Sequence, residues 1–299
     1  MPEINCYEII ENTCLTDNVF SLTVKCEKIA GKASAGQFIH IKCGAERLLR
    51  RPISICDAQD GQLRSIYEIK GEGTQWLSER CRGEWLDILG PLGSGYVFPE
   101  ATKGTENSKD PKDPEGTKDS EDSEDSEDSE GYEGNIIVVG GGIGIPPMLF
   151  AAKSARRKVK SAKGYISSEK GQVKAILGFR DADRLILRDE FEAICDDVII
   201  TTDDGSLGYH GAVTAPLAGL LETGGVNAVL ACGPRAMLSA VAGLCSQHEV
   251  PCQVSMEERM GCGVGACMVC SCATVIDGKE HMSRVCKDGP VFNADIIAW

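Results

Sequence analysis

Residues 136 to 147 read Ile136-Ile137-Val138-Val139-Gly140-Gly141-Gly142-Ile143-Gly144-Ile145-Pro146-Pro147. The four apolar residues at the start are typical of a strand that is covered on both faces. The glycines predict a tight turn, and residues 148–153 predict the helix that follows it. A strand, a glycine-rich turn and a helix start together form a phosphate-binding arrangement, because free N–H groups there face the ligand.

The glycine turn has the pattern G-x-G-x-x-P, and not the G-x-G-x-x-G of the ordinary dinucleotide-binding fingerprint. Proline suits the first helical turn, where its missing N–H group is not needed. We therefore expect a dinucleotide phosphate site here. Its candidate residues are Gly140, Gly142, Gly144 and Pro147.

Further strand and helix units follow this stretch. Strands are predicted at residues 173–179, 198–202, 228–232 and 252–256, and helices at 187–194, 213–221 and 236–245. This alternation predicts a parallel, doubly wound sheet, which residues 252–256 close. Ligands bind at the carboxyl ends of such strands. Those ends carry residues 178–180, 202–205 and 232–234, and we expect them to line one cleft.

The C-terminal part of the chain contains a cluster of thiols. Residues 261–270 read GCGVGACMVC, so that Cys262, Cys267 and Cys270 have the spacing C-x4-C-x2-C, and Cys286 follows Cys270. This is the plant-type spacing of [2Fe–2S] ligands. A zinc site is the alternative, although structural zinc usually shows paired C-x2-C knuckles. Cys272 does not fit the spacing, and we expect it to bind no metal.

Residues 1–99 predict a small antiparallel β-barrel. Alternating segments at 19–24, 37–42, 53–56, 63–69 and 85–89 are separated by short turns that contain glycine and aspartate. One short helix is predicted at residues 74–79, with Thr74 as its N-cap.

Two barrel segments have the chemistry of a phosphate and flavin site. Residues 51–54 (RPIS) place an arginine next to a hydroxyl group on a strand, which suits a pyrophosphate and a flavin ring. Residues 71–74 (GEGT) open the short helix, where free N–H groups can bind a phosphate. Each segment alone could be an ordinary edge strand or turn, and their order and separation favour the functional interpretation.

A low-complexity acidic segment separates the two halves. It contains fourteen Asp and Glu and four Lys between residues 100 and 133, and therefore carries most of the net charge of −14. Its repeats of Asp, Ser and Glu have no apolar residues to bury, so we expect a disordered insertion, with an interaction tail as the alternative. The acidic balance argues against nucleic-acid binding. The predicted division is 1–99 barrel, 100–134 insertion, 135–250 α/β domain and 251–299 cluster module.

The fifteen cysteines do not suggest a disulfide framework, because the N-terminus lacks a secretory signal pattern. No apolar run is long enough to span a bilayer. We therefore expect a cytoplasmic protein that does not enter a membrane, in which most cysteines outside the cluster are small buried hydrophobic residues.

Taken together, these segments resemble the ferredoxin–NADP reductase superfamily, and most closely its electron-transfer subunits of type 1B dihydroorotate dehydrogenases. The markers are residues 49–55 (LRRPISI), 255–263 (SMEERMGCG) and 285–292 (VCKDGPVF). The first identifies only the superfamily, and the other two are narrower. The resemblance covers the chain outside residues 101–133.

The resemblance implies an NAD-dependent flavin and iron–sulfur oxidoreductase. NADH binds the sheet domain, FAD binds the barrel, and the [2Fe–2S] cluster exchanges electrons with an FMN-containing catalytic subunit. That subunit oxidises dihydroorotate to orotate in pyrimidine biosynthesis. The implied assembly is a heterotetramer with two copies of each subunit.

The resemblance also implies roles for individual residues. The flavin contacts are Arg51, Pro52, Ile53, Ser54, Ile66, Tyr67, Glu68, Gly73 and Thr74. The nicotinamide nucleotide contacts are Gly140, Gly142, Gly144, Pro147, Cys232, Gly233 and Pro234, with Cys232 as a thiol near the nicotinamide. The cluster ligands are Cys262, Cys267, Cys270 and Cys286. Glu68 departs from the family, because an acidic side chain near a phosphate is unfavourable.

Two other functions fit the same motifs. One is an NAD(P)H:acceptor reductase with a different partner, such as the subunits of sulfide dehydrogenase or ferredoxin:NADP reductase. The other is a sensor that binds flavin and cluster without catalysis. Residues alone do not distinguish NAD from NADP.

Overall fold

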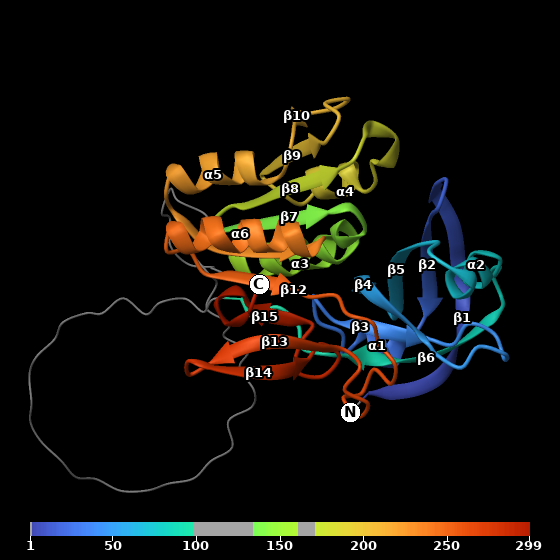
Figure 1. The fold of residues 1–299 in the computed structure, drawn as a ribbon. Coiled ribbons are helices and arrows are strands. Elements are labelled where there is room, and N and C mark those ends of the chain that lie inside the picture. The colour runs from blue at the N-terminus through green and yellow to red at the C-terminus, as the bar shows by residue number, and fades with distance from the viewer. Residues whose placement is uncertain (1, 99–133, 161–170) are drawn as a thin grey trace, which may run out of the picture.

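The structure is a computed structural model that describes residues 2–98, 134–160 and 171–299 (Figure 1). It contains a β-barrel, an α/β sheet domain and a C-terminal module that lies against both of them. The predicted fold class is therefore confirmed. The predicted acidic insertion lies outside the described residues.

The N-terminal part is a closed barrel of six antiparallel strands in the order β1-β2-β5-β4-β3-β6. Its strands are β1 (Glu3–Thr16), β2 (Val19–Lys25), β3 (Phe38–Ile41), β4 (Arg51–Gln59), β5 (Gln62–Glu68) and β6 (Trp85–Leu92). The sequence prediction named no strand over β1, because most of its side chains are exposed or half-buried and show no clear alternation. Its pairing with β2 and β6 closes the barrel.

Two short helices cover gaps in the barrel, α1 (Glu27–Ala30) and α2 (Glu72–Ser78). The prediction that Thr74 is the N-cap of the second helix was wrong. The helix begins earlier, with Gly71 before its first residue. The Thr74 hydroxyl reaches back and accepts hydrogen bonds from the N–H groups of Lys70 and Gly71, at 2.9 and 3.3 Å. Thr74 therefore stabilises the helix start from one turn inside it.

The sheet domain has seven strands in the order β10-β9-β8-β7-β11-β12-β15. The strands are β7 (Asn135–Gly141), β8 (Val173–Phe179), β9 (Asp197–Thr202), β10 (Tyr209–His210), β11 (Val226–Cys232), β12 (Cys252–Ser255) and β15 (Val291–Asn293). The helices are α3 (Ile145–Lys160), α4 (Arg188–Glu192), α5 (Thr214–Glu222) and α6 (Arg235–Gln247). All neighbouring strands are parallel except β15, which adds an antiparallel strand beyond the predicted last one.

The alternation of β7 explains how the sheet is covered. Ile136 and Val138 belong to the core that α3 and the barrel share, whereas Ile137 and Val139 belong to the core beneath α5 and α6. The glycine turn forms the short 3-10 helix η1 (Gly142–Gly144) and leads into α3 at Ile145, three residues before the predicted helix start. Helix α3 also packs on β4, so one helix links the phosphate turn to the barrel.

The C-terminal module consists of the cluster loop, the hairpin of β13 (Ser271–Ile276) and β14 (Lys279–Arg284), and β15. It joins both neighbours through backbone hydrogen bonds. The N–H group of Ser94 donates to the Gly289 carbonyl at 2.6 Å, and that of Met256 donates to the Pro290 carbonyl at 2.8 Å. Across the described residues, no helix has the length and apolar character needed to cross a membrane.

Candidate functional site

The four predicted cluster thiols lie in the C-terminal module as two pairs. In the first pair, the N–H group of Cys262 donates to Sγ of Cys267 at 3.4 Å. In the second pair, the N–H group of Cys286 donates to Sγ of Cys270 at 3.4 Å. A third hydrogen bond joins the pairs, because the N–H group of Gly265 donates to Sγ of Cys286 at 3.1 Å. The hairpin thus brings together two segments that are distant in sequence.

The loop that follows Cys262 turns its N–H groups toward sulfur. The N–H groups of Val264 and Ala266 donate to Sγ of Cys262 at 3.5 and 3.2 Å. Gly263 and Gly265 make this turn possible, because their φ angles of +72° and +80° lie in the left-handed region that side chains disfavour. The spacing of glycines and thiols therefore produces a wrapped loop with inward N–H donors.

One thiol of each pair, Cys262 and Cys286, differs from the other in how readily it ionises. Burial opposes ionisation of Cys262, but the N–H groups of the loop stabilise its thiolate and lower its pKa to about 6. Burial, followed by contact with the Cys270 thiol, raises the pKa of Cys286 to about 12. Cys262 therefore offers a thiolate at neutral pH, whereas Cys286 remains a thiol.

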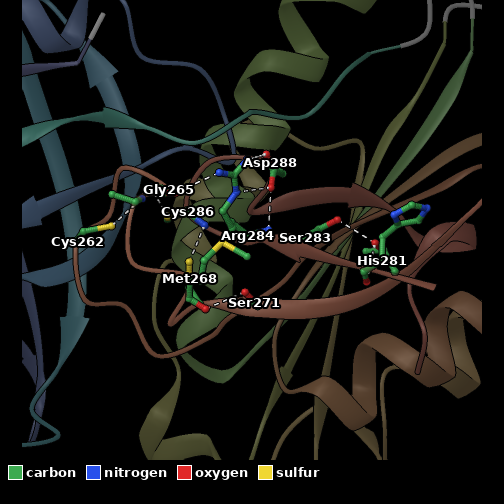
Figure 2. Close-up of polar contacts among 12 residues, drawn as sticks. Cys262, Gly265, Met268, Ser271, His281, Ser283, Arg284, Cys286 and Asp288 are labelled. Atoms are coloured by element: carbon green, nitrogen blue, oxygen red, sulfur yellow. Dashed lines mark hydrogen bonds and ion pairs between the residues drawn. The ribbon is translucent and has the colours of Figure 1, made fainter.

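A salt bridge holds the second segment against the loop (Figure 2). The Arg284 side chain donates to both carboxylate oxygens of Asp288, at 2.9 and 3.0 Å. The same guanidinium donates to the Gly265 carbonyl at 3.1 Å. The aliphatic part of Lys287 covers Gly265, where a Cβ atom would lie 2.5 Å from its Cδ. These contacts fix Cys286 relative to the loop.

This arrangement fits a binuclear cluster. A [2Fe–2S] cluster takes two thiolates on each iron, and N–H groups that point to sulfur suit it. Two adjacent thiol pairs with surrounding N–H donors match that requirement.

The predicted flavin residues form two groups in the barrel. The Arg51 side chain lies directly over Gly73, where a Cβ atom would overlap its guanidinium. A guanidinium beside the first turn of a helix is a suitable site for a pyrophosphate. Pro52 and Ser54 lie on the next part of β4, where they pair with His40 and Phe38 of β3. Ile53 lies between them and packs on the barrel core.

The side chains of β5 contribute differently from what the resemblance implies. Ile66 and Tyr67 are buried in the barrel core, and the Tyr67 hydroxyl donates to Asn12 at 3.1 Å. A flavin contact from these two residues would therefore use the backbone. The Glu68 carboxylate accepts a hydrogen bond from Asn18 at 3.0 Å and lies 3.6 Å from the Lys70 ammonium group. These partners offset the unfavourable charge of Glu68.

His40 of β3 is a buried polar residue that the flavin and nucleotide predictions did not include. Its side chain is fully buried, and within residues 2–98, 134–160 and 171–299 neither ring nitrogen has a hydrogen-bond partner. Burial, and then the nearby charge of Arg50, lowers its pKa to about 4. The neutral imidazole therefore has one donor and one acceptor nitrogen.

A cavity of about 520 Å³ lies between the barrel and the carboxyl ends of the sheet strands. It is lined by predicted strand ends, among them Gly178, Phe179, Arg180, Asp203 and Pro234. The turn between β1 and β2 and the Glu68 side chain close it from the barrel side. Its volume is in the range of small-molecule and cofactor sites.

Of the predicted nucleotide residues, Gly142 and Pro234 line this cavity, and the other five do not. Gly142 is exposed, with a φ angle of +54°. A Cβ atom on Gly144 would be 2.5 Å from the Cys232 carbonyl oxygen. A Cβ atom on Gly140 would lie 2.9 Å from Ile145. Gly140 and Gly144 therefore permit close packing of the turn, while Pro147 is buried in the first turn of α3.

The Cys-Gly-Pro turn after β11 lies across from the glycine turn. Pro234 lines the cavity, and a Cβ atom on Gly233 would lie 2.5 Å from the Met237 side chain. Burial raises the pKa of the Cys232 thiol to about 12, although a hydrogen bond with Ser255 counters this. Cys232 is therefore a neutral thiol at physiological pH, which suits a contact with an uncharged ring and excludes a thiolate nucleophile.

Charged and polar contacts connect the barrel, and the segment that follows it, to the sheet domain. Lys153 of α3 donates to Asp57 of β4 at 2.5 Å, and Arg64 of β5 donates to both oxygens of Glu190 at 2.8 Å. The Tyr96 hydroxyl donates to the Ala231 carbonyl at 2.9 Å. These contacts position the barrel residues opposite the strand ends.

Comparison with known proteins identifies the family. Residues 257–298 match the iron–sulfur cluster binding domain of dihydroorotate dehydrogenase B. The chain is 32% identical to the dihydroorotate dehydrogenase B (NAD(+)) electron transfer subunit of Caldanaerobacter subterraneus subsp. tengcongensis, over 97% of both chains. It is 35% identical to that of Bacillus pumilus, over 97% of this chain and 96% of the relative. The chain belongs to this family of electron transfer subunits.

A solved structure shares the fold over nearly the whole chain. The work on the NADH-dependent reduced ferredoxin–NADP oxidoreductase describes a chain with a TM-score of 0.75 and 27% identity. The match covers 98% of this chain and 90% of that one. A cytochrome b5 reductase domain of Ulva prolifera nitrate reductase, at 15% identity and a TM-score of 0.57, shares the fold alone.

The family match covers the cluster region that the thiol spacing predicted. All four paired cysteines lie within residues 257–298. Cys272 lies in the same region, but it is buried on β13 and pairs with Ser283 of β14. The sequence analysis missed three contributors to the sites, namely His40, Arg284 and Asn18. The only sequence signal for His40 was its polar side chain within the alternating segment 37–42.

Proposed function

We propose that this chain carries electrons between an FMN-containing dihydroorotate dehydrogenase catalytic subunit and NAD, in pyrimidine biosynthesis. The cavity at the strand ends binds the nicotinamide nucleotide, the barrel binds FAD, and the four thiols bind the [2Fe–2S] cluster. When bound, the flavin would exchange a hydride, which carries two electrons, with the nicotinamide and single electrons with the cluster.

The residues of the chain hold these three groups in order. Arg51 and the first turn of α2 bind the flavin pyrophosphate, and Ser54 on the same strand reaches the flavin ring. Gly142 and Pro234, from two turns that pack against each other, both line the cavity that binds the nucleotide. The neutral Cys232 thiol packs beside the nicotinamide without competing for the hydride. The paired thiols bind the two irons in the C-terminal module.

One observation carries this proposal, namely that the cluster loop touches the barrel strand next to the flavin motif. Gly263 of the loop packs against His40 of β3, and His40 lies directly opposite Pro52 of β4. Electron exchange between two cofactors requires them to be held close together. The fold meets that requirement without a mobile linker between the two sites.

The outer side of the cluster loop provides the surface for a catalytic subunit. The loop exposes Val264, Met268 and Val269, with 46%, 51% and 58% of their surfaces accessible. Exposed apolar side chains grouped beside a redox site are typical of an interaction surface. We propose that the partner binds here in an assembly with two copies of each subunit, and that the complex works in the cytoplasm.

The test of this function is reconstitution of the complete reaction. The purified chain is mixed with a candidate FMN-containing catalytic subunit, and NADH-dependent reduction of orotate is measured. We expect activity only when both subunits are present, and none when the chain carries Cys286→Ser. Reduction of flavin by NADH with no orotate reduction in any mixture would refute the assignment to the pyrimidine pathway.

A reductase with another partner is the second candidate, because the structural match to the NADH-dependent ferredoxin–NADP oxidoreductase spans nearly the whole chain. Electron transfer from NADH or NADPH to ferredoxin, in the absence of any catalytic subunit, would favour this candidate. A sensor would differ from both, since it needs no nucleotide exchange. Anaerobic addition of NADH then leaves the flavin absorbance unchanged.

A further inference from the structure

The imidazole of His40 joins the barrel to the cluster loop in a way that its burial alone does not explain. Along β3, Ile39 and Ile41 face the barrel core, so Phe38 and His40 face outward. Phe38 lies in the same apolar core as Cys270 and Cys286. His40 therefore lies on the barrel face that the cluster module covers.

The ring is oriented with its polar edge toward the cluster loop. A Cβ atom on Gly263 would lie 2.5 Å from Cε1 of His40, 2.7 Å from Nδ1 and 2.9 Å from Nε2. These three atoms form the nitrogen-bearing edge of the imidazole. Gly263 directly follows the cluster ligand Cys262, so both ring nitrogens approach the loop beside a ligand.

Both ring nitrogens are buried and lack a hydrogen-bond partner among the residues that the structure describes. Burying a polar group without a partner costs about 1–3 kcal/mol, so such groups usually meet a ligand or an ordered water. Apolar residues could fill this position, as they do on the rest of the strand, and would avoid that cost. A hydrogen-bond acceptor at the cluster loop accounts for a histidine here.

We propose that His40 donates a hydrogen bond from its imidazole to a sulfur atom of the [2Fe–2S] site and thereby raises the reduction potential of the cluster. Hydrogen bonds to cluster sulfurs are one of the levers that set such potentials, because they stabilise the more negative reduced state. His40 acts through the cluster and is a tuning residue. The inference needs the cluster site only, and it holds whichever partner exchanges electrons with the cluster.

The first experiment uses the intact wild-type holoprotein. Histidine is labelled with ¹⁵N while all other nitrogens stay ¹⁴N, and the reduced cluster is studied by pulsed electron paramagnetic resonance. We expect a weak ¹⁵N coupling that disappears in His40→Leu or His40→Gln and persists in His281→Gln, which changes the histidine on β14 of the C-terminal module. Absence of any histidine coupling in the wild-type protein would overturn the proposal.

The second experiment measures potentials. Removal of the donor in His40→Leu should lower the equilibrium constant for cluster reduction about tenfold, which corresponds to 59 mV for a one-electron couple. His40→Gln keeps an amide donor and should recover part of this shift, whereas His281→Gln should leave the potential unchanged. If His40→Leu changed only the reduction potential of the flavin, the hydrogen-bond acceptor of His40 would be the flavin. That result would refute the proposed hydrogen bond to the cluster.

Discussion

The barrel has two boundaries, and they are built in different ways. Toward the sheet domain it is joined by charged and polar contacts such as Lys153 with Asp57 and Arg64 with Glu190, and a cavity of about 520 Å³ lies beside them. Toward the cluster module it is joined by close backbone contact. There the N–H group of Ser94 donates to the Gly289 carbonyl, and Phe38 shares an apolar core with the cluster thiols.

This difference follows from what each boundary must do. In the proposed function, a nucleotide enters and leaves at the sheet boundary, which requires a cavity there. Only electrons would then cross the boundary with the cluster module. A close-packed contact keeps the distance between the two cofactors constant, because protein interiors are as dense as organic crystals. The two halves of the electron path thus use opposite kinds of packing.

Removal of a cluster ligand should distinguish the two boundaries most strongly. Cys270→Ser takes one thiolate from the buried pair, and we expect complete loss of the [2Fe–2S] absorbance and of electron transfer to the partner. NADH should still reduce the flavin, because the other boundary is untouched. Cys272→Ser, two residues away and buried on β13, is the matched control and should keep the cluster. Equal loss in both variants would contradict the ligand assignment.

A substitution in the close-packed boundary should have the next largest effect. A Cβ atom on Gly93 would lie 2.5 Å from Cδ of Pro290 and 2.7 Å from the Gly289 carbonyl oxygen. We expect Gly93→Ala to lower the free energy of unfolding by about 2–4 kcal/mol, measured in urea. Gly83→Ala is the control, since its φ angle is similarly positive but no atom lies within 4 Å. The difference in the free energy of unfolding between Gly93→Ala and Gly83→Ala isolates the cost of disturbing the close packing.

The two thiol pairs should differ in reactivity after removal of the cluster. The pKa of Cys262 is about 6, so its alkylation by iodoacetamide should be nearly pH-independent at neutral pH. Below pH 6 the rate should fall about tenfold per pH unit, because the thiolate fraction falls by that factor. Cys286, with a pKa of about 12, should stay unmodified throughout. Mass spectrometry of the peptides measures the modification of each thiol. Faster modification of Cys286 than of Cys262 would contradict the prediction.

The smallest effect is expected at the polar boundary. Lys153→Ala removes an ion pair with Asp57 whose side chains are 22% and 16% exposed. We expect a loss of about 1–2 kcal/mol in the free energy of unfolding, between the values typical of exposed and buried pairs. Lys32→Ala breaks a more exposed pair with Glu3 and should cost less. If both variants lose the same free energy of unfolding, the pair of Lys153 and Asp57 does not hold the barrel and the sheet domain together.

Local patterns in the sequence predicted much of this molecule. The apolar run and glycine turn at residues 136–147 specified the sheet domain, because strand, turn and helix are adjacent in the chain. The spacing of Cys262, Cys267 and Cys270 specified the cluster loop for the same reason. Both features depend on neighbours in sequence, which a single chain displays directly.

Features that depend on tertiary contact were missed. The first strand, β1, has no clear alternation, and its place is set by pairing with β2 and β6. Thr74 was assigned to the helix start, but its hydroxyl caps the helix from inside the first turn. His40 resembled an ordinary strand residue, and only the arrival of Gly263 from far along the chain gives its ring a neighbour.

The antiparallel strand β15 has a consequence for how the protein is made. Val291–Asn293 completes the sheet beside β12, and it follows all four cluster thiols in the chain. During synthesis the sheet edge therefore cannot close before these thiols have been made. The module that carries them is fastened to the sheet only when β15 pairs with β12. Removal of residues 290–299 would therefore leave the sheet edge open and the cluster loop unsupported.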